Sequence, residues 1–201
     1  MKADPLDLVP VRHQVTAQER AARTRHYGAV LWFTGLPGSG KSTLAMALER
    51  RLFDREWQVY TLDGDNVRRG LSADLGFSPR DRAENIRRVG EVAALFADSG
   101  LVVVTAFISP YRADRHRARM AAGDGFHEIY IKASLETCEK RDPKGLYRKA
   151  RSGEIADFTG VTAPYETPES PELMIDTDRL TIEESVAAAL EYVDRNFRKT
   201  A

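Results

Sequence analysis

A short glycine-rich segment between an apolar run and an amphipathic run constrains this chain more than any other feature. Residues 29–34 read AVLWFT, residues 41–53 read KSTLAMALERRLF, and GLPGSG lies between them. The pattern G-x-x-x-x-G-K-[ST] matches from Gly35 to Ser42. Glycines let successive backbone N–H groups curl around phosphate oxygens, and the N-terminus of the following helix adds partial positive charge. The segment therefore predicts a strand, a phosphate-binding loop and a helix in direct succession.

The residues of this loop have separate expected roles in binding a nucleotide. Lys41 is expected to reach the β- and γ-phosphates, and the Ser42 hydroxyl to ligate Mg²⁺. The sequence contains no N-K-x-D-type guanine signature, which favours ATP over GTP. The expected nucleotide-binding residues are Gly35, Leu36, Pro37, Gly38, Ser39, Gly40, Lys41, Ser42 and Thr43.

Apolar, strand-like runs recur along the chain with helix-like segments between them. They cover residues 29–35, 57–64, 101–107, 127–133 and 172–177. Ser78 followed by Pro79 is typical of a helix start, and Thr181 with Glu184 has the spacing of a capping box. Strands that alternate with helices predict an α/β fold of the P-loop NTPase type, with a mainly parallel sheet covered on both faces.

Two segments do not follow this alternation of strands and helices. Residues 1–27 are polar and carry two prolines, so they predict an N-terminal arm with one short helix, and residues 28–201 predict the catalytic domain. Residues 142–171 are basic and punctuated by glycine and proline, which favours a lid, placed at about 142–162.

Composition excludes several functional classes. Lys plus Arg and Asp plus Glu both number 30, so the net charge is zero, which argues against a broad surface for nucleic acid or an anionic membrane. No apolar run approaches the ~18–20 residues that span a bilayer, and the first residues lack the apolar core of a secretory signal. Cys138 is the single cysteine, so no internal disulfide forms and a reducing compartment is favoured. We expect a cytoplasmic globular protein.

A second group of polar residues follows the second strand-like run. Asp63, Asp65 and Arg68 lie in LDGDNVRRGL, at the carboxyl end of that run, where open α/β sheets bind ligands. One carboxylate near Mg²⁺ is suited to orient an acceptor hydroxyl, while the arginine neutralises an anionic group. Taken alone, DGDN is more often a solvated turn. Further on, Arg82 and Asn85 are three residues apart and share a helix face.

The order of several longer segments resembles that of the adenylyl-sulfate kinases. These segments are GLPGSGKST, LDGDNVRRGL, LGFSPRDRAENIRRVGEVAALFADSG, FISPYRADR, RDPKGLYRKARSGEI and FTGVTAPYE, and the resemblance covers about residues 12–197. It implies transfer of the γ-phosphoryl group of ATP to the 3′-hydroxyl of adenosine 5′-phosphosulfate. It also implies Mg²⁺, a homodimer, and a possible partnership with a sulfate adenylyltransferase. Pro37 departs from the family pattern but spares the required glycines and lysine.

The resemblance also implies roles for individual side chains. Asp63 would lie near Mg²⁺ and the acceptor hydroxyl, Phe77 and Phe158 would sandwich the acceptor adenine, and Arg141 would lie near the ATP base. Lys41, Asp63 and Ser109 are the expected catalytic residues, with Ser42 and Asp63 as metal ligands. The expected substrate-binding residues are Asp65, Arg68, Phe77, Arg82, Asn85, Ile108, Ser109, Lys144, Phe158, Gly160, Val161 and Thr162, with Lys144 on the lid over both substrates.

Two questions stay open at this stage. Ser109 matches a family position proposed as a phosphoserine intermediate, but it also precedes Pro110 as a helix cap would, and we favour the cap. The chain as a whole has two weaker alternatives: another small P-loop kinase acting on a nucleoside, sugar or shikimate-like alcohol, and an inert nucleotide-responsive regulatory domain.

Overall fold

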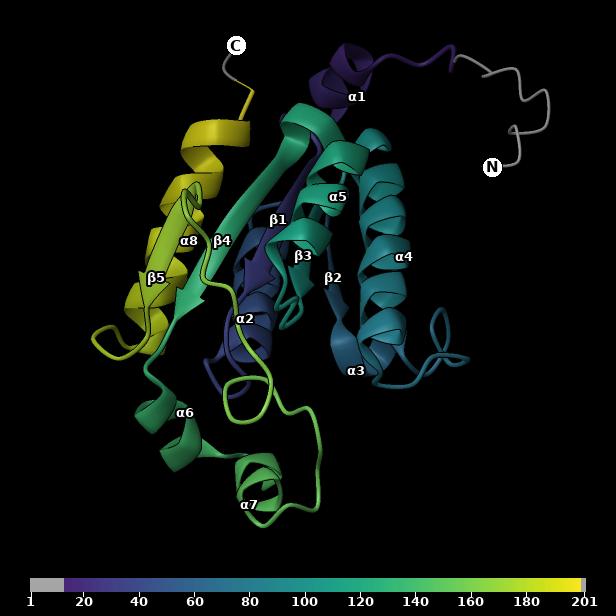
Figure 1. Cartoon of the computed structure of the whole chain (residues 1–201). Helices are drawn as coiled ribbons and strands as arrows, with labels where there is room; N and C mark the ends of the chain where they lie inside the picture. The colour runs from purple at the N-terminus through teal and green to yellow at the C-terminus, as the bar shows by residue number, and fades with distance from the viewer. Residues whose placement is uncertain (1–12, 200–201) are drawn as a thin grey trace, which may run out of the picture.

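Five parallel strands form a single sheet in the computed structural model, which describes residues 13–199 (Figure 1). The strands are β1 (Ala29–Thr34), β2 (Val59–Asp63), β3 (Val102–Ala106), β4 (Phe126–Lys132) and β5 (Leu173–Asp176). Their order in the sheet is β2-β3-β1-β4-β5, and every neighbouring pair is parallel. Each of the five expected strands is confirmed, and so is the α/β fold of the P-loop type.

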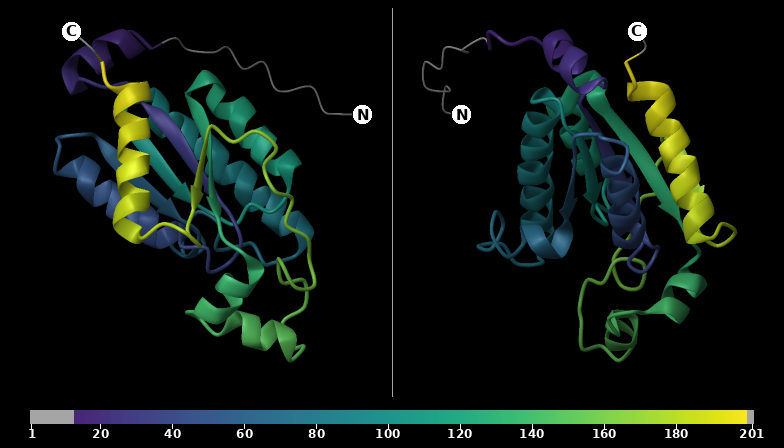
Figure 2. Two further views of the ribbon diagram at one scale, coloured as in Figure 1. Left: turned by 90° about the vertical axis from the view of Figure 1, so that its left-hand side faces the viewer. Right: turned by 180° about the vertical axis from the view of Figure 1, so that it is seen from behind.

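Helices cover both faces of the sheet and extend beyond its two ends. The helical elements are α1 (Ala17–Thr24), α2 (Lys41–Phe53), α3 (Gly64–Val67), α4 (Pro79–Asp98), α5 (Arg112–Ala122), η1 (Gly123–Gly125), α6 (Leu135–Arg141), α7 (Leu146–Arg151) and α8 (Ile182–Phe197). Helices α2 and α8 pack on one face, whereas α4 and α5 pack on the other (Figures 1 and 2). Among residues 13–199, no helix is long and apolar enough to cross a membrane.

The central strand β1 shows why the sheet is covered on both sides. Leu31 and Phe33 enter the core shared with α2 and α8, whereas Val30 and Trp32 enter the core shared with α4 and α5. Alternate side chains of a strand point to opposite faces, so a strand that is apolar at every position needs two apolar layers. All six residues of β1 are buried.

The two helix starts expected from the sequence are confirmed. The Ser78 hydroxyl accepts a hydrogen bond from the backbone N–H of Asp81, and Pro79 occupies the first turn of α4. Thr181 and Glu184 form a reciprocal capping box at the start of α8.

Helix α1 lies at the end of the molecule opposite α6 and α7 (Figure 2). The expected arm falls partly on residues 1–12, which lie outside the described residues. Beyond them, α1 is followed by His26, which is buried, stacks on Trp57 at 4.5 Å between ring centroids, and pairs with Arg198 through a β-bridge.

Helices α6 and α7 lie beyond the carboxyl ends of the strands, at the bottom of the view in Figure 1. They share a small apolar cluster separate from the two cores of the sheet, formed by Ala133, Cys138, Tyr147, Ala150 and Phe158. The sequence predicted a lid in this region but no helix or apolar cluster within it. Helix α7 and this cluster are therefore seen only in the structure.

Candidate active site

Three strands end side by side at the carboxyl edge of the sheet. Asp63 at the end of β2 is in register with Ala106 of β3, and Ala106 is in register with Phe33 of β1. The loop after β3 therefore lies between Asp63 and the glycine-rich loop after β1. The carboxyl edge of an open parallel sheet is the usual position for a ligand site.

The glycine-rich loop has a backbone that other residues cannot adopt without strain. A Cβ atom on Gly35 would lie 2.3 Å from the carbonyl oxygen of Ile131. Gly40 is the N-cap of α2 with φ +99°, and a Cβ atom there would meet no atom within 4 Å. Because Gly40 has no side chain to cap α2, the first N–H groups of the helix are left for an anion.

Lys41 lies inside this loop rather than in solvent. Its Nζ atom donates hydrogen bonds to the carbonyl oxygens of Gly35 at 3.0 Å and Leu36 at 2.8 Å, and to Ser39 Oγ at 3.4 Å. Burial lowers the pKa of Lys41 to about 8. All three of its hydrogen-bond partners are neutral, so no anion pairs directly with this amine, and a phosphate group would supply that pairing.

Ser42 and Asp63 bring together the loop after β1 and the end of β2. The Ser42 hydroxyl donates a hydrogen bond to Asp63 Oδ2 at 2.6 Å, and Asp63 Oδ1 accepts one from the backbone N–H of Asp65 at 3.0 Å. Within residues 13–199 no group of three acidic, His or Cys side chains is placed to hold a metal by itself. Mg²⁺ in phosphate-transferring sites needs only one or two protein oxygens and takes the rest from phosphates and water. One hydroxyl and one carboxylate oxygen in contact fit that requirement.

Two arginines, Arg68 and Arg82, lie close to each other beyond Asp63, on the side expected for the acceptor. The Arg68 guanidinium lies 4.4 Å from the ring centroid of Phe77 and donates to the carbonyl oxygen of Gly76 at 2.9 Å. Burial, followed by the neighbouring charge of Arg82, lowers the pKa of Arg68. An anionic ligand between the two guanidinium groups would relieve that repulsion.

Arg82 and Asn85 share the face of α4 that the spacing predicted. Arg82 donates to the carbonyl oxygen of Asp157 at 2.6 Å and to Thr159 Oγ1 at 3.3 Å, so it contacts the segment after α7. Asn85 is buried, and its side-chain carbonyl oxygen has no hydrogen-bond partner within the described part of the chain. An unpaired buried amide oxygen is costly in a finished core but expected at a site that awaits a ligand.

The segment from α6 to residue 162 contacts both halves of the site. Lys144 forms an ion pair with Asp65, on the acceptor side. The Tyr147 hydroxyl donates to the carbonyl oxygen of Pro37 at 2.9 Å, on the phosphate-loop side. These contacts give the expected lid its position over the loop.

The turn at residues 158–163 brings the remaining lid residues against the phosphate loop. Thr162 Oγ1 accepts from the backbone N–H of Phe158 at 2.9 Å, and a Cβ atom on Gly160 would lie 3.0 Å from Leu36 Cδ2. A cavity of about 500 Å³ beside this turn is lined by Leu36, Tyr130, Leu135 and residues 160–165 and 167. Arg68, Phe77, Arg82 and Asn85 do not line it.

The two aromatic rings expected around an adenine differ in environment. Phe77 is 68% exposed, whereas Phe158 is 8% exposed and packs edge-on against Tyr147 in the lid cluster, 5.0 Å between ring centroids. Their joint role around an adenine stays a prediction.

Arg141 lies at the opposite side of the phosphate loop from Arg82. Its guanidinium donates to the carbonyl oxygen of Thr177 at 2.6 Å and to Thr177 Oγ1 at 3.1 Å. The Thr177 hydroxyl in turn donates to the carbonyl oxygen of Ser39 at 3.0 Å. Arg141 therefore joins the lid to the phosphate loop through the residue that follows β5.

Ser109 does not cap a helix, so the favoured structural interpretation is wrong. Helix α5 begins at Arg112 with Tyr111 as its N-cap, and Ser109 has φ +39°. Its hydroxyl is buried and accepts a hydrogen bond from the Trp32 indole N–H at 3.1 Å. Its neighbour Ile108 contributes a carbonyl oxygen that accepts from the Thr34 hydroxyl at 2.8 Å. Both residues therefore lie in the loop after β3.

Sequence reasoning missed Tyr147, Thr177 and Arg115 as parts of this region. Tyr147 lies 110 residues from the carbonyl group that it contacts, and Thr177 lies 138 residues from Ser39. Tyr147 lies in RDPKGLYRKARSGEI, one of the segments that carry the resemblance, but that segment gave it no role, and Thr177 lies in no such segment. The position of Thr177 at the end of a strand-like run, on the edge that carries the site, is the one signal that pointed to it.

Comparisons with known proteins agree on one family. The sequence matches the family described as "Adenylylsulphate kinase" over residues 27–176. The adenylyl-sulfate kinase of Staphylococcus epidermidis is 59% identical over 181 residues, 90% of this chain and 91% of the relative. That of Geotalea uraniireducens is 56% identical over 196 residues, 97% and 94% of the two chains.

A solved structure gives the same result for the fold. The APS kinase CysC of Mycobacterium tuberculosis, in complex with AMPPNP and APS, is 48% identical and superposes with a TM-score of 0.80, covering 84% of this chain and 98% of that one. A match at this identity and coverage, together with the family match over residues 27–176, leaves one assignment: the chain belongs to the adenylylsulphate kinase family.

Proposed function

We propose that this chain transfers the γ-phosphoryl group of ATP to the 3′-hydroxyl of adenosine 5′-phosphosulfate, giving ADP and 3′-phosphoadenosine 5′-phosphosulfate. The observation that carries this most directly is the hydrogen bond of 2.6 Å between Ser42 and Asp63. It joins the phosphate-binding loop to the carboxylate that faces the acceptor side. The relative solved with AMPPNP and APS supports both the donor and the acceptor.

Residues 35–43 are proposed to bind the triphosphate of ATP. The free N–H groups at the start of α2 and the Lys41 amine would supply positive charge, and Lys41 would exchange its present carbonyl partners for β- and γ-phosphate oxygens. Arg141 would lie beside the ATP base. A Mg²⁺ ion held by Ser42 and Asp63 would neutralise charge on the phosphate oxygens.

Asp63 is proposed to orient the acceptor hydroxyl. Its two carboxylate oxygens already accept from Ser42 and from the backbone of Asp65, which fixes the plane of the group. Arg68, Arg82 and the side-chain amide N–H groups of Asn85 would donate to the phosphosulfate end. Phosphoryl transfer needs positioning and charge stabilisation more than covalent catalysis by the protein, so a direct transfer without Ser109 as an intermediate is proposed.

The lid is proposed to exclude water from this reaction. Tyr147 reaches the phosphate loop and Lys144 reaches Asp65, so both substrates would lie under one segment. A kinase site open to water risks hydrolysing ATP.

A coupled ADP-release assay tests the proposal. Adenosine 5′-phosphosulfate, adenosine monophosphate and shikimate are offered side by side with Mg²⁺ and ATP. Turnover with the phosphosulfate alone is expected. Preference for another alcohol would indicate a different small kinase, and no turnover in a protein that binds ATP would indicate a regulatory domain.

A homodimer is proposed as the assembly, and a sulfate adenylyltransferase as a possible partner. The APS kinase of Thiobacillus denitrificans, 35% identical with a TM-score of 0.66, is hexameric, which supports self-association in the family. This chain covers 31% of that longer chain. Light scattering on the purified protein tests the dimer, and co-purification tests the partner.

A further inference from the structure

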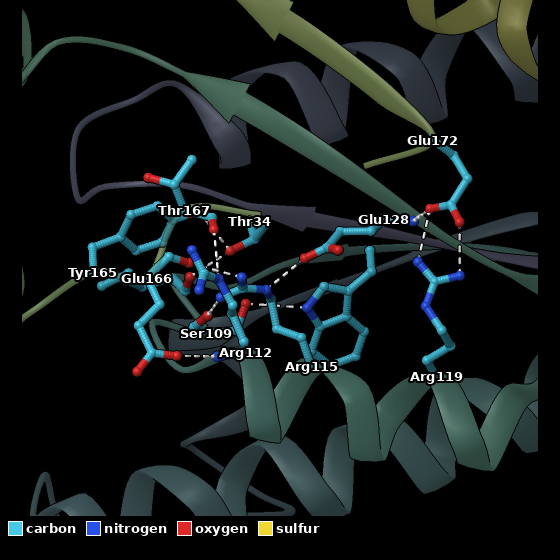
Figure 3. A network of polar contacts seen from close by, with 12 residues as sticks. Thr34, Ser109, Arg112, Arg115, Arg119, Glu128, Tyr165, Glu166, Thr167 and Glu172 are labelled. Atoms are coloured by element: carbon cyan, nitrogen blue, oxygen red, sulfur yellow. Dashed lines mark hydrogen bonds and ion pairs between the residues drawn. The ribbon is translucent and has the colours of Figure 1, made fainter. Parts of the chain in front are cut away.

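A buried arginine contacts the loop after β3, which carries Ile108 and Ser109, two of the expected substrate-binding residues. Arg115 is on α5, its side chain is 3% exposed, and its Nε atom donates to Glu128 Oε1 on β4 at 2.5 Å. The other two nitrogens of the guanidinium donate to backbone carbonyl groups, at 2.8 Å each (Figure 3). An arginine presents five donors in a fixed plane, so it can join several acceptors in one geometry.

The two carbonyl groups belong to segments that are far apart in the chain. One is that of Ser109, in the acceptor loop, which we define as residues 107–111 after β3. The other is that of Glu166, in the return strap, which we define as residues 163–167 on the path back from the lid. The acceptor loop lies between Asp63 and the phosphate loop, because β1, β2 and β3 end in register.

Glu166 makes two further contacts, one with the acceptor loop and one with Arg112, the first residue of α5. Its backbone N–H donates to the carbonyl oxygen of Pro110 at 2.8 Å. Its carboxylate accepts from the backbone N–H of Arg112 at 2.7 Å (Figure 3). The strap therefore supplies the acid at the start of α5 that an N-cap side chain would otherwise provide, which explains why Ser109 is not needed there.

The acceptor loop needs such support because its backbone is strained. Ser109 has φ +39°, a region that non-glycine residues rarely occupy. Two contacts hold it: the Trp32 indole on its hydroxyl and the Arg115 guanidinium on its carbonyl. Without the second contact, the buried carbonyl group of Ser109 would lose the donor that fixes its orientation.

We propose that Arg115 is a positioning residue for the acceptor. By holding Ser109 and Glu166 on one guanidinium, it fixes the acceptor loop against the return strap and so sets the acceptor pocket relative to the lid. It makes no contact with residues 35–43, so the ATP site depends on it less. This inference rests on the proposed function.

Three variants separate positioning from simple stability. Arg115→Lys keeps the charge beside Glu128 but loses the planar fork that reaches both carbonyl groups. Glu128→Gln removes the countercharge and keeps the arginine on the carbonyl groups. Arg119→Lys is the matched control, because Arg119 lies one turn further along α5 and pairs with Glu172 at 2.7 and 2.9 Å without touching either segment (Figure 3).

Steady-state kinetics of the full chain give the deciding measurement. Arg115→Lys is expected to raise the KM for adenosine 5′-phosphosulfate about tenfold or more and to leave the KM for ATP within about twofold. Glu128→Gln is expected to lower the thermal midpoint with a nearly unchanged acceptor KM, and Arg119→Lys to change neither KM.

Other outcomes would overturn the inference. Equal changes in both KM values, no change, or the same shift in Arg119→Lys would each show that Arg115 serves stability alone. Should Arg115→Lys fail to fold, Glu166→Ala removes the side-chain contact between the return strap and Arg112, the residue directly after the acceptor loop. An unchanged acceptor KM in that variant would also refute the inference. An inactive wild-type chain would refute the proposed function instead.

Discussion

Nucleotide binding is expected to draw a proton from solution onto Lys41. In the free protein, burial among carbonyl groups lowers the pKa of this amine to about 8, from an ordinary value of 10.5. The difference corresponds to about 3 kcal/mol in favour of the neutral amine. Phosphate groups at the loop would reverse this preference, because an opposite charge within a few ångströms favours the charged form.

The magnitude follows from the pKa alone. With a pKa of about 8, about half of the Lys41 amines are neutral at pH 8 and about one tenth at pH 7. If the bound state is fully protonated, binding takes up about 0.5 proton at pH 8 and about 0.1 at pH 7. The uptake should therefore grow as the pH rises toward 8.

Isothermal titration calorimetry measures this uptake. The observed enthalpy of Mg²⁺–ATP binding is plotted against the ionisation enthalpy of several buffers, and the slope is the number of protons. Lys41→Arg is the control, because a guanidinium stays protonated, and its slope should be close to zero. A wild-type slope near zero at pH 8, or one equal at both pH values, would refute the account of Lys41.

The same lowered pKa has a consequence for stability, with a definite sign. Between about pH 8 and 10.5 the unfolded chain holds a proton on Lys41 that the free folded chain has lost. Since the unfolded state binds more protons there, the free energy of unfolding contributed by Lys41 rises with pH across this window and is flat below it. Saturating nucleotide should remove that slope.

Three further predictions concern other contacts of the site. Asp63→Asn should retain ATP binding but lower kcat by about 100-fold in the ADP-release assay, and a small loss would mean that Asp63 only caps α3. Tyr147→Phe leaves the buried carbonyl group of Pro37 without its donor, so the free energy of unfolding should fall by about 1–3 kcal/mol and the KM for ATP should rise. Urea titration measures the first and steady-state kinetics the second. No change in either would contradict the inference that Tyr147 holds the lid against the phosphate loop. Ser109→Ala deprives a buried indole of its acceptor, with a similar cost, yet should keep substantial turnover. Inversion at a chiral γ-phosphorus would agree with that, and net retention would not.

Much of the fold was predictable because its signals are local. Each strand is a short apolar run, and the glycine-rich loop is read from eight consecutive residues, Gly35 to Ser42. The cap at Ser78 and the capping box at Thr181 depend on residues within one helical turn. Such patterns depend on contacts between residues that are close in the sequence, so they do not require knowledge of the tertiary structure.

The failures have the opposite character. Ser109 has the local pattern of a cap, but Glu166, distant in sequence, supplies the acid at the start of α5. The strand order could not be read from the pattern either, because each strand pairing joins residues that are far apart in the chain. Arg115 is one of several arginines on α5, and nothing in the sequence distinguishes it from the others. Its contact with Glu128 on β4 is seen only in the structure.

The lid was predicted from length and composition, but the internal structure of this segment was not. Its helices are short, and their apolar residues are few and irregularly spaced, so no helical period emerges. Tyr147 and Phe158 become a cluster only when the chain folds back between them.

The single cysteine of the chain makes this lid cluster observable without engineering. Cys138 is fully buried between α6, α7 and the phosphate loop, where its backbone lies against Gly38. Burial also raises the pKa of its thiol, so the reactive thiolate is scarce while the cluster is closed. The rate of alkylation by a thiol reagent therefore reports how often α6 and α7 separate from the loop. Substrates that keep the lid closed should slow this reaction, so the alkylation rates with and without substrates would compare how often the cluster opens in the free and the bound enzyme.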